Sequence, residues 1–487
     1  MDDEYWSKVG SGCTSSVRGI LDMDAFELQI HLRLRHPPEE ARDIYLNRPC
    51  ILVHPTTPRI ISVNYIAKNV YGISRDKDSV KEALRKCQDL MVVKKNSLQI
   101  PTGPSPSNPM VEKAEVEELI RSSDAVLDAI VEWRKMGGLR IILSNVSNDE
   151  TFLDLAEEVD IRMRKNPALL VNGETIGQNT HMEGKTKFKG PAIAFRYHNV
   201  HSENMDQYSE ERRLIVGAII LEEFRKYVFK QTGLEASGGV AVNNLVAKLA
   251  CSLHKPGGMT IILPNGFPRI SKRIPIEKVP TWGGQVGKTL KECFGRNMFD
   301  LTQIPVKLMS TKTGLGYETC KRISNMAHGI YFEELREKLM KETLTVGISN
   351  LRAATLWYSN LDRLRYVVKE LLVELCGRLE REERRHRRKA DSVRVEFQLN
   401  PKGHRGQALP NRGFTLNQPE FVRLLASPTN VRVQDLEWLL DRVFENYSAT
   451  ILQEFRAATI VKISLHVPSF SSLCPSVPDP QTIAHAF

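Results

Sequence analysis

Apolar residues along the chain fall into short runs and longer periodic faces, and the two patterns predict different elements. Short apolar runs predict buried strands at 17–26, 50–53, 60–63, 139–143, 151–155 and 237–242. Apolar residues spaced three and four apart predict helices at 27–35, 77–87, 111–133, 209–232 and 244–253. The fourth helix is followed by Gly233 and the fifth is preceded by Asn243, which are typical stop and cap residues. This mixture predicts an α/β (α+β) fold.

The pattern changes after Pro256-Gly257-Gly258 to short helices separated by glycine turns, up to about Glu342. A further region begins near Thr345. It is predicted to contain a long helix from Leu361 to about Lys389 and strands at 393–399 and 458–467. Segments rich in proline and serine predict irregular structure at 101–109 and 468–480.

Length and composition exclude several classes of protein. The 487 residues suffice for roughly two to four domains, and 41% apolar with 26% charged residues is typical of a globular protein. No apolar run approaches the roughly 20 residues of a membrane helix, so no membrane partner is expected. The acidic start Met1-Asp2-Asp3-Glu4 is unlike a secretory signal. The 8 cysteines form no CxxC pair, which argues against a structural zinc site. A net charge of +10 favours a polyanionic partner.

Acidic residues lie at the ends of two predicted strands. Asp22 lies near the end of the first strand, and Asp149 and Glu150 immediately precede the strand 151–155. Adjacent central strands would bring these ends together, and clustered carboxylates are suitable ligands for Mg²⁺. Two bound Mg²⁺ ions serve phosphoryl transfer by activating an attacking oxygen and stabilising a leaving one. The alternative is that these are ordinary solvated acids of loops.

Two further features could contact phosphate. Lys255 follows the helix 244–253 and precedes Pro256, where its ammonium could reach a phosphate or simply complement the helix dipole. A glycine-rich turn containing Gly284 and Gly287, followed by Lys288, could present backbone N–H groups to an anion. A plain loop between helices is the alternative for the turn.

A basic run lies near the end of the long predicted helix. It includes Arg381, Arg384, Arg385, Arg387, Arg388 and Lys389, and it is interspersed with glutamates. Lys402, His404 and Arg405 follow shortly. The run would either form a solvated helix end or present a basic face to backbone phosphates.

In this order, these segments resemble the motifs of the Y-family of translesion DNA polymerases, and within that family the eta type. The similarity extends over about residues 16–470. It is carried by the segments 20–26, 62–68, 71–75, 147–155, 237–256, 280–288 and 460–469. The resemblance implies a right-hand polymerase built from palm, fingers, thumb and little-finger domains. The implied boundaries are 1–30 and 99–258 for the palm, 31–98 for the fingers, 259–342 for the thumb, 343–470 for the little finger and 471–487 for an irregular tail.

The resemblance also implies roles for individual residues. Asp22, Asp149 and Glu150, together with the backbone carbonyl of Met23, would hold two Mg²⁺ ions, or Mn²⁺ in their place. Tyr65, Lys68 and Lys255 would bind the incoming triphosphate, and Arg75 and His54 would lie over the nascent base pair. Gly284, Gly287, Lys288, Arg387 and Arg388 would contact DNA.

The implied activity is nucleotidyl transfer by a DNA-directed DNA polymerase that copies damaged templates during DNA repair in the nucleus. Its partners would be primer–template DNA and deoxynucleoside triphosphates. A sliding clamp is a further candidate partner, because residues 481–487 resemble a degenerate clamp-binding box.

The sequence departs from the family pattern at four positions near the implied site. Glu27 stands where an aromatic residue usually excludes a ribose 2′-hydroxyl, and Lys68 stands where Arg is usual. Asn244 replaces a usual Lys, and His54 replaces the Gln of the eta type. These departures keep two alternatives open: a non-catalytic DNA-binding scaffold, and another Y-family branch such as the kappa or iota type. The intact acids Asp22, Asp149 and Glu150 argue against the scaffold.

Overall fold

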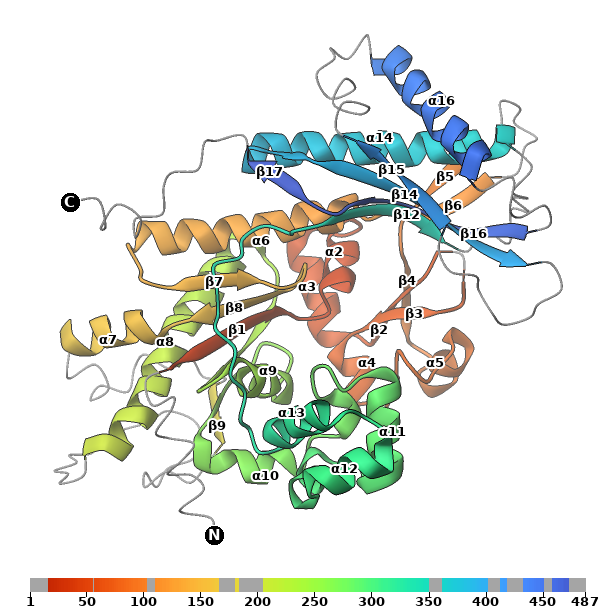
Figure 1. The fold of residues 1–487 in the computed structure, drawn as a ribbon. Coiled ribbons are helices and arrows are strands. Elements are labelled where there is room, and N and C mark those ends of the chain that lie inside the picture. The colour runs from red at the N-terminus through yellow and green to blue at the C-terminus, as the bar shows by residue number, and fades with distance from the viewer. Residues whose placement is uncertain are drawn as a thin grey trace, which may run out of the picture. The chain divides into compact units, whose positions relative to one another are not determined.

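The computed structural model describes residues 16–55, 57–102, 110–165, 180–183, 205–349, 361–401, 412–417, 432–450 and 458–472. Contacts divide the chain into two compact units. Figure 1 labels the helices and strands along the chain. The first comprises Met1–Val53, Pro58–Lys94 and Val116–Leu339, and the second comprises His54–Thr57, Lys95–Glu115 and Met340–Phe487. None of the helices within the described residues is long and apolar enough to cross a membrane.

A mixed sheet forms the centre of the first unit. Its strand order is β7-β8-β1-β10-β11-β9, and β1 is antiparallel to both of its neighbours. The strands are β1 (Arg18–Met23), β7 (Ile142–Asn145), β8 (Glu150–Asp154), β9 (Thr180–Glu183), β10 (Ala236–Ala241) and β11 (Met259–Ile262). Consecutive strand residues point to opposite faces, so β1 contributes Leu21 to one apolar cluster and Ile20 to another.

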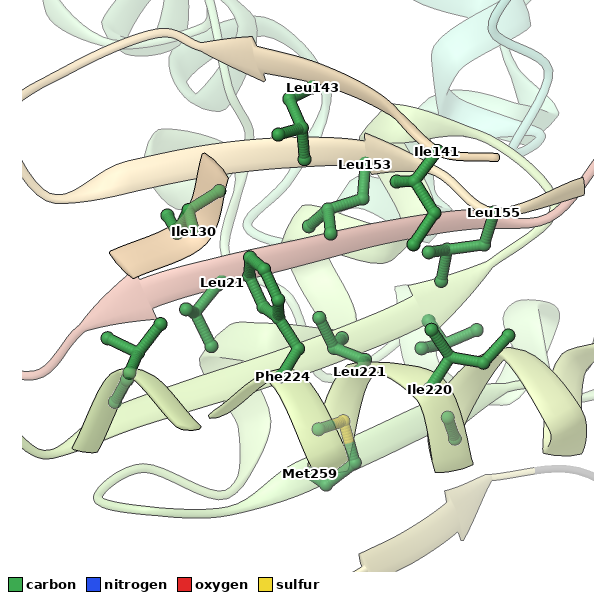
Figure 2. Close-up of a cluster of buried hydrophobic side chains, with 14 of the residues drawn as sticks. Leu21, Ile130, Ile141, Leu143, Leu153, Leu155, Ile220, Leu221, Phe224 and Met259 are labelled. Atoms are coloured by element: carbon green, nitrogen blue, oxygen red, sulfur yellow. The ribbon is translucent and has the colours of Figure 1, made fainter. Parts of the chain in front are cut away.

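Helices cover both faces of this sheet. On one face, Leu21, Leu143 and Leu153 pack with Ile130 and Phe224 of two long helices (Figure 2). These helices are α6 (Glu117–Met136) and α8 (Met205–Thr232). On the other face, Ile20 packs against α9 (Asn244–Leu253) and the short helices that follow it. The buried β1 is therefore fixed from both sides, and this fixes the acids at its end.

The remaining elements of the first unit form two groups. A small sheet has the order β3-β2-β4, with the strands β2 (Cys50–Val53), β3 (Ile60–Val63) and β4 (Met91–Lys94). It packs with four helices: α2 (Phe26–Arg33), α3 (Pro38–Asn47), α4 (Tyr65–Asn69) and α5 (Val80–Lys86). Short helices follow β11: η1 (Pro264–Gly266), α10 (Phe267–Ser271), η2 (Ile276–Lys278), α11 (Gly284–Phe294), η3 (Met298–Gln303), α12 (Val306–Thr313) and α13 (Tyr317–Ala327). Helix α7 (Ala156–Lys165) follows β8.

The second unit contains a sheet of order β12-β16-β14-β15, with the strands β12 (Leu344–Ser349), β14 (Ser392–Pro401), β15 (Arg412–Asn417) and β16 (Ala458–Val467). It packs against α14 (Leu361–His386) and α16 (Arg432–Thr450). Two pairs complete the unit: β5 (Ser97–Pro101) with β6 (Met110–Ala114), and β13 (Arg388–Ala390) with β17 (Phe470–Ser472).

Most predicted elements are confirmed within a few residues, and three need correction. Residues 111–114 form the strand β6 rather than helix, because they pair with β5. The long helix ends at His386 because Arg387 adopts a left-handed φ of 49°. Part of the segment predicted to be irregular forms β17, which pairs with β13. The predictions for residues 103–109 and 473–487 lie outside the described residues, as do those for Lys402, His404 and Arg405.

The packing of α9 against β10 predicts a stability effect at Gly239. A Cβ atom there would lie 2.1 Å from the carbonyl oxygen of Ala247 and 2.4 Å from the backbone nitrogen of Cys251. Backbone atoms of a helix cannot move aside singly, so Gly239→Ala is expected to lower the free energy of unfolding by about 1–3 kcal/mol or more. Gly283→Ala is the control, because a Cβ atom there meets nothing within 4 Å. Equal urea midpoints for the two variants would contradict this account.

Candidate active site

Strand periodicity places Asp22 and Glu150 on the same face of the central sheet. Asp22 lies two residues after Ile20, and Glu150 lies two residues before Phe152. Ile20 and Phe152 both pack in the cluster formed with α9. Asp22 and Glu150 are also direct partners in the antiparallel pairing of β1 with β8. The predicted meeting of the two acidic strand ends is therefore confirmed for this pair.

Asp149 is held at the same end by its backbone and side chain. Its carbonyl oxygen accepts a hydrogen bond from the backbone N–H of Met23 at 2.9 Å. Its carboxylate Oδ1 accepts one from the Ser147 hydroxyl at 2.6 Å, and the Ser147 oxygen accepts one from the Glu150 N–H at 3.1 Å. The tight turn before β8 thus fixes Asp149 and Glu150 next to the end of β1.

Two lysines neutralise the paired acids. Lys255 Nζ lies 2.5 Å from Asp22 Oδ1, and Lys248 Nζ of α9 lies 2.6 Å from Glu150 Oε2. Burial raises the pKa of Asp22 to about 6, Lys255 opposes this rise, and the nearby Glu150 adds to it. Lys255 thus lies beside the acid pair, and its contact with the triphosphate stays a prediction.

Tyr65 and Lys68 extend the site from α4. The helix begins where Asn64 Oδ1 accepts a hydrogen bond from the Ala67 N–H at 3.0 Å. Burial raises the pKa of Tyr65, and the charge of Lys255 opposes this rise. Burial also lowers the pKa of Lys68, and the positive charges of Lys278 and Lys255 act in the same direction. Lys68 Nζ also lies 5.5 Å from the centre of the Tyr65 ring, so the two side chains are neighbours on α4.

The remaining predicted nucleotide residues lie in the loops that follow β2 and α4, and in α2. Arg75 is exposed, and its Nε lies 3.2 Å from Asp76 Oδ1. His54 follows β2 and is grouped with the second unit, so its role over the nascent base pair stays a prediction. Glu27 is half-buried in the first turn of α2, where a carboxylate also complements the helix dipole.

The predicted DNA-contacting residues occupy two different settings. Gly284 has a φ of 67° at the start of α11, and a Cβ atom on Gly287 would lie 2.0 Å from the Trp282 carbonyl oxygen. Both positions thus require glycine, and Lys288 is exposed beside them.

Arg387 is exposed and Arg388 is buried. Arg388 Nη2 lies 2.6 Å from Glu382 Oε2, and its guanidinium covers the Phe470 ring at 4.1 Å. Their phosphate contacts stay predictions, and the surroundings of Arg388 give it a role in the fold of the second unit.

The acid pair has the chemistry of a magnesium site. Within the described residues, no group of three His, Cys, Asp or Glu side chains is already drawn together to hold a metal ion. Asp22 and Glu150 nevertheless offer hard oxygen ligands from neighbouring strands, and each accepts an ammonium group at hydrogen-bonding distance. These ammonium groups occupy positions that suit a cation, so the residues fit divalent metal ions.

Two charged residues of this site were not singled out from the sequence. Asp24 and Lys248 both lie within the motifs described above, but their partners are distant in the chain. A weak signal existed for Lys248, because it precedes Lys255 by seven residues, or two helical turns. Asp24 gave no such signal, because its contacts depend on the fold.

Parts of the chain are similar to known proteins. Residues 21–252 match the sequence model of the impB/mucB/samB family. The chain is 24% identical to DNA polymerase eta of Drosophila melanogaster over 396 residues, which cover 78% of this chain and 41% of the relative. It is 24% identical to DNA polymerase iota of Mus musculus over 310 residues, which cover 63% of this chain and 36% of the relative. It is 27% identical to DNA polymerase eta of Arabidopsis thaliana over 238 residues, which cover 48% of this chain and 34% of the relative.

Residues 21–252 are thus similar to the impB/mucB/samB family, and the relatives that match the chain are named DNA polymerases. The matched parts span less than half the length of each of these three relatives.

Proposed function

We propose that this protein is a template-directed DNA polymerase of the eta type that performs translesion synthesis past damaged bases. The observation that carries the proposal is the pairing of Asp22 with Glu150 across β1 and β8, with Lys255 2.5 Å from Asp22. An acid pair beside a half-buried lysine is suited to a nucleoside triphosphate and its metal ions. The family match supports polymerisation as the reaction, and the relatives named eta support the branch.

The proposed anatomy is that of a right hand. The central sheet with α6, α8 and α9 would be the palm, and the small sheet β3-β2-β4 with α4 and α5 would belong to the fingers. The short helices of 259–342 would be the thumb. The sheet β12-β16-β14-β15 with its two helices would be the little finger.

Asp22, Asp149, Glu150 and the carbonyl of Met23 would hold two Mg²⁺ ions, or Mn²⁺ in their place. When bound, these ions supply the positive charge that favours an attacking primer 3′-oxygen and a leaving pyrophosphate. The carboxylates would hold this charge in a fixed position, because Asp22 and Glu150 belong to paired strands that cannot move independently of each other. Metal binding requires ionised carboxylates, so a pKa of about 6 at Asp22 favours occupation as the pH rises above that value.

The basic groups would bind the incoming deoxynucleoside triphosphate. Lys255, Lys68 and the Tyr65 hydroxyl would contact its phosphates. Lys255 lies 2.5 Å from Asp22, and Lys68 lies close to the Tyr65 ring. His54 and Arg75 would cover the nascent base pair. Primer–template DNA would be held through backbone phosphates by Lys288, Arg387 and the N–H groups near Gly284 and Gly287, which gives affinity with little sequence preference.

Primer extension tests this proposal directly. The purified protein is expected to add nucleotides to a primer opposite both undamaged and lesion-containing templates when Mg²⁺ is present. DNA binding without extension in either Mg²⁺ or Mn²⁺ would instead support a non-catalytic scaffold.

We further propose a nuclear location and, through residues 481–487, a sliding clamp as partner. Both follow from the proposed repair function.

Binding to primer–template DNA is expected to weaken steeply with salt. The net charge of +10 and the basic residues Lys288 and Arg387 favour phosphate contacts. Each contact should add about 0.9 to the slope of log affinity against log salt concentration. Fluorescence anisotropy between 50 and 200 mM salt, roughly the range in which such losses are measurable, provides the slope. A flat response would show that the basic residues serve only as solvated surface.

A further inference from the structure

Asp24 is a buried acid beside the candidate site without a role in the mechanism above. It follows the last residue of β1, and its side chain is fully buried. Its backbone N–H donates a hydrogen bond to the Glu235 carbonyl oxygen at 2.9 Å. Gln29 fastens the same stretch, because its Oε1 accepts from the Glu235 N–H at 2.8 Å and its Nε2 donates to the Asp24 carbonyl oxygen. Asp24 is therefore held rigidly by chain segments on both sides.

The two carboxylate oxygens of Asp24 have different surroundings. Oδ2 accepts hydrogen bonds from the Ser237 hydroxyl at 2.7 Å and from the Gly257 N–H at 2.8 Å. Oδ1 accepts no hydrogen bond from any described residue, and Lys255 Nζ lies 3.4 Å from it. One oxygen thus fixes the carboxylate in place, and the other is directed at the Lys255 ammonium.

Lys255 lies between two carboxylates, one that a metal ion can reach from solvent and one that it cannot. The Asp22 side chain keeps 17% of its surface exposed, whereas the Asp24 side chain keeps none. A cation held by Asp22 would repel the Lys255 ammonium and take over its partner. That cation cannot reach Asp24, because the Asp24 side chain is fully buried and its Oδ2 already accepts two hydrogen bonds. The Asp24 carboxylate would therefore continue to attract Lys255.

We propose that Asp24 is a positioning residue: it holds the Lys255 ammonium at the triphosphate when Asp22 is engaged by metal. This inference rests on the proposed polymerase function. It predicts that loss of the Asp24 charge weakens nucleotide binding more than it slows the chemical step, because Lys255 contacts the phosphates in both the ground state and the transition state.

Asp24→Asn is the appropriate change. The asparagine oxygen can replace Oδ2 and keep both hydrogen bonds, while its amide replaces Oδ1 and presents N–H groups to Lys255. The variant should raise KM for the deoxynucleoside triphosphate about tenfold or more and leave kcat within about threefold, the scale of one charged contact. Glu158→Gln is the matched control. It neutralises a buried acid whose partners are Arg162 and the Arg140 N–H, and it should leave KM unchanged.

A double-mutant cycle tests whether Asp24 acts through Lys255. In a Lys255→Ala background, Asp24→Asn should have little further effect on KM, because the group that it positions is gone. Independent effects of the two changes, which multiply in the double variant, would overturn the proposal. The proposal would also be overturned if Asp24→Asn lowered kcat without raising KM. If the unmodified protein extends no primer, the proposed polymerase function fails instead, and the two failures are thereby distinguished.

Binding without turnover provides a second readout. Inorganic tripolyphosphate with Mg²⁺ should raise the melting temperature of the unmodified protein and of Glu158→Gln, but raise that of Asp24→Asn much less. Equal shifts in all three would overturn the proposal.

If Asp24→Asn does not fold, Ser237→Ala replaces it, since it removes one hydrogen bond to Oδ2 and keeps the charge. Ser237→Ala should raise KM about two- to threefold in the presence of Lys255 and not in its absence. An unchanged KM in the presence of Lys255 would count against the proposal.

Discussion

Asp22→Asn is expected to reduce the rate of nucleotide addition by about a thousandfold or more, because a lost ligand removes metal charge that is worth several kcal/mol in the transition state. Asp149→Asn should have an effect of similar size. Both side chains lie at the ends of strands fixed in the central sheet, so the loss cannot be compensated by a small movement. Single-turnover extension of a labelled primer measures the rate, and anisotropy measures DNA binding, which should change little.

Asp154→Asn is the control for this prediction. Asp154 lies at the opposite end of β8, where it forms an ion pair with Arg18. Its replacement should lower the melting temperature without a comparable loss of extension. If Asp22→Asn and Asp149→Asn extend primers at rates near those of Asp154→Asn, the acid pair is not the catalytic centre.

Glu27→Phe is expected to increase the preference for deoxy- over ribonucleotides by about tenfold or more, the scale on which a single pocket contact discriminates one small group. The resemblance implies that this residue would lie at the sugar of the incoming nucleotide, where an aromatic ring would block a 2′-hydroxyl. A carboxylate is thinner and can accept a hydrogen bond from that hydroxyl. The unmodified protein should therefore incorporate ribonucleotides more readily than one with an aromatic residue there.

The measurement is the ratio of kcat/KM for matched deoxy- and ribonucleoside triphosphates. Glu27→Gln separates charge from shape, since it keeps the size and removes the charge. Glu39→Phe repeats the change in the first turn of α3, at an exposed position, and should leave the ratio unaltered. If the unmodified protein already excludes ribonucleotides by orders of magnitude and Glu27→Phe alters nothing, another residue excludes the 2′-hydroxyl.

Local sequence determined much of the fold because several elements depend on nearby residues alone. The cap Asn243, which accepts from the Val246 N–H at 2.9 Å, and the predicted range 244–253 match α9 as found. The strands β2, β3 and β16 also begin and end where their apolar runs do. The acids of β1 and β8 were identified together because strand ends that carry carboxylates are visible in the chain, and Asp22 and Glu150 are direct partners in the structure. Their role as metal ligands stays a prediction.

Other features were decided only by contacts between distant segments. Residues 111–114 have helical periodicity, but Val111 packs in the core of the second unit and pairs with Ile100, so the segment is a strand. The partners of the site acids lie far along the chain as well: Lys255 approaches Asp22 and Asp24, and Lys248 approaches Glu150. Local sequence fixes propensity and periodicity, whereas tertiary structure fixes which charges meet. A charge buried at the end of a strand is stable only when packing brings it a partner.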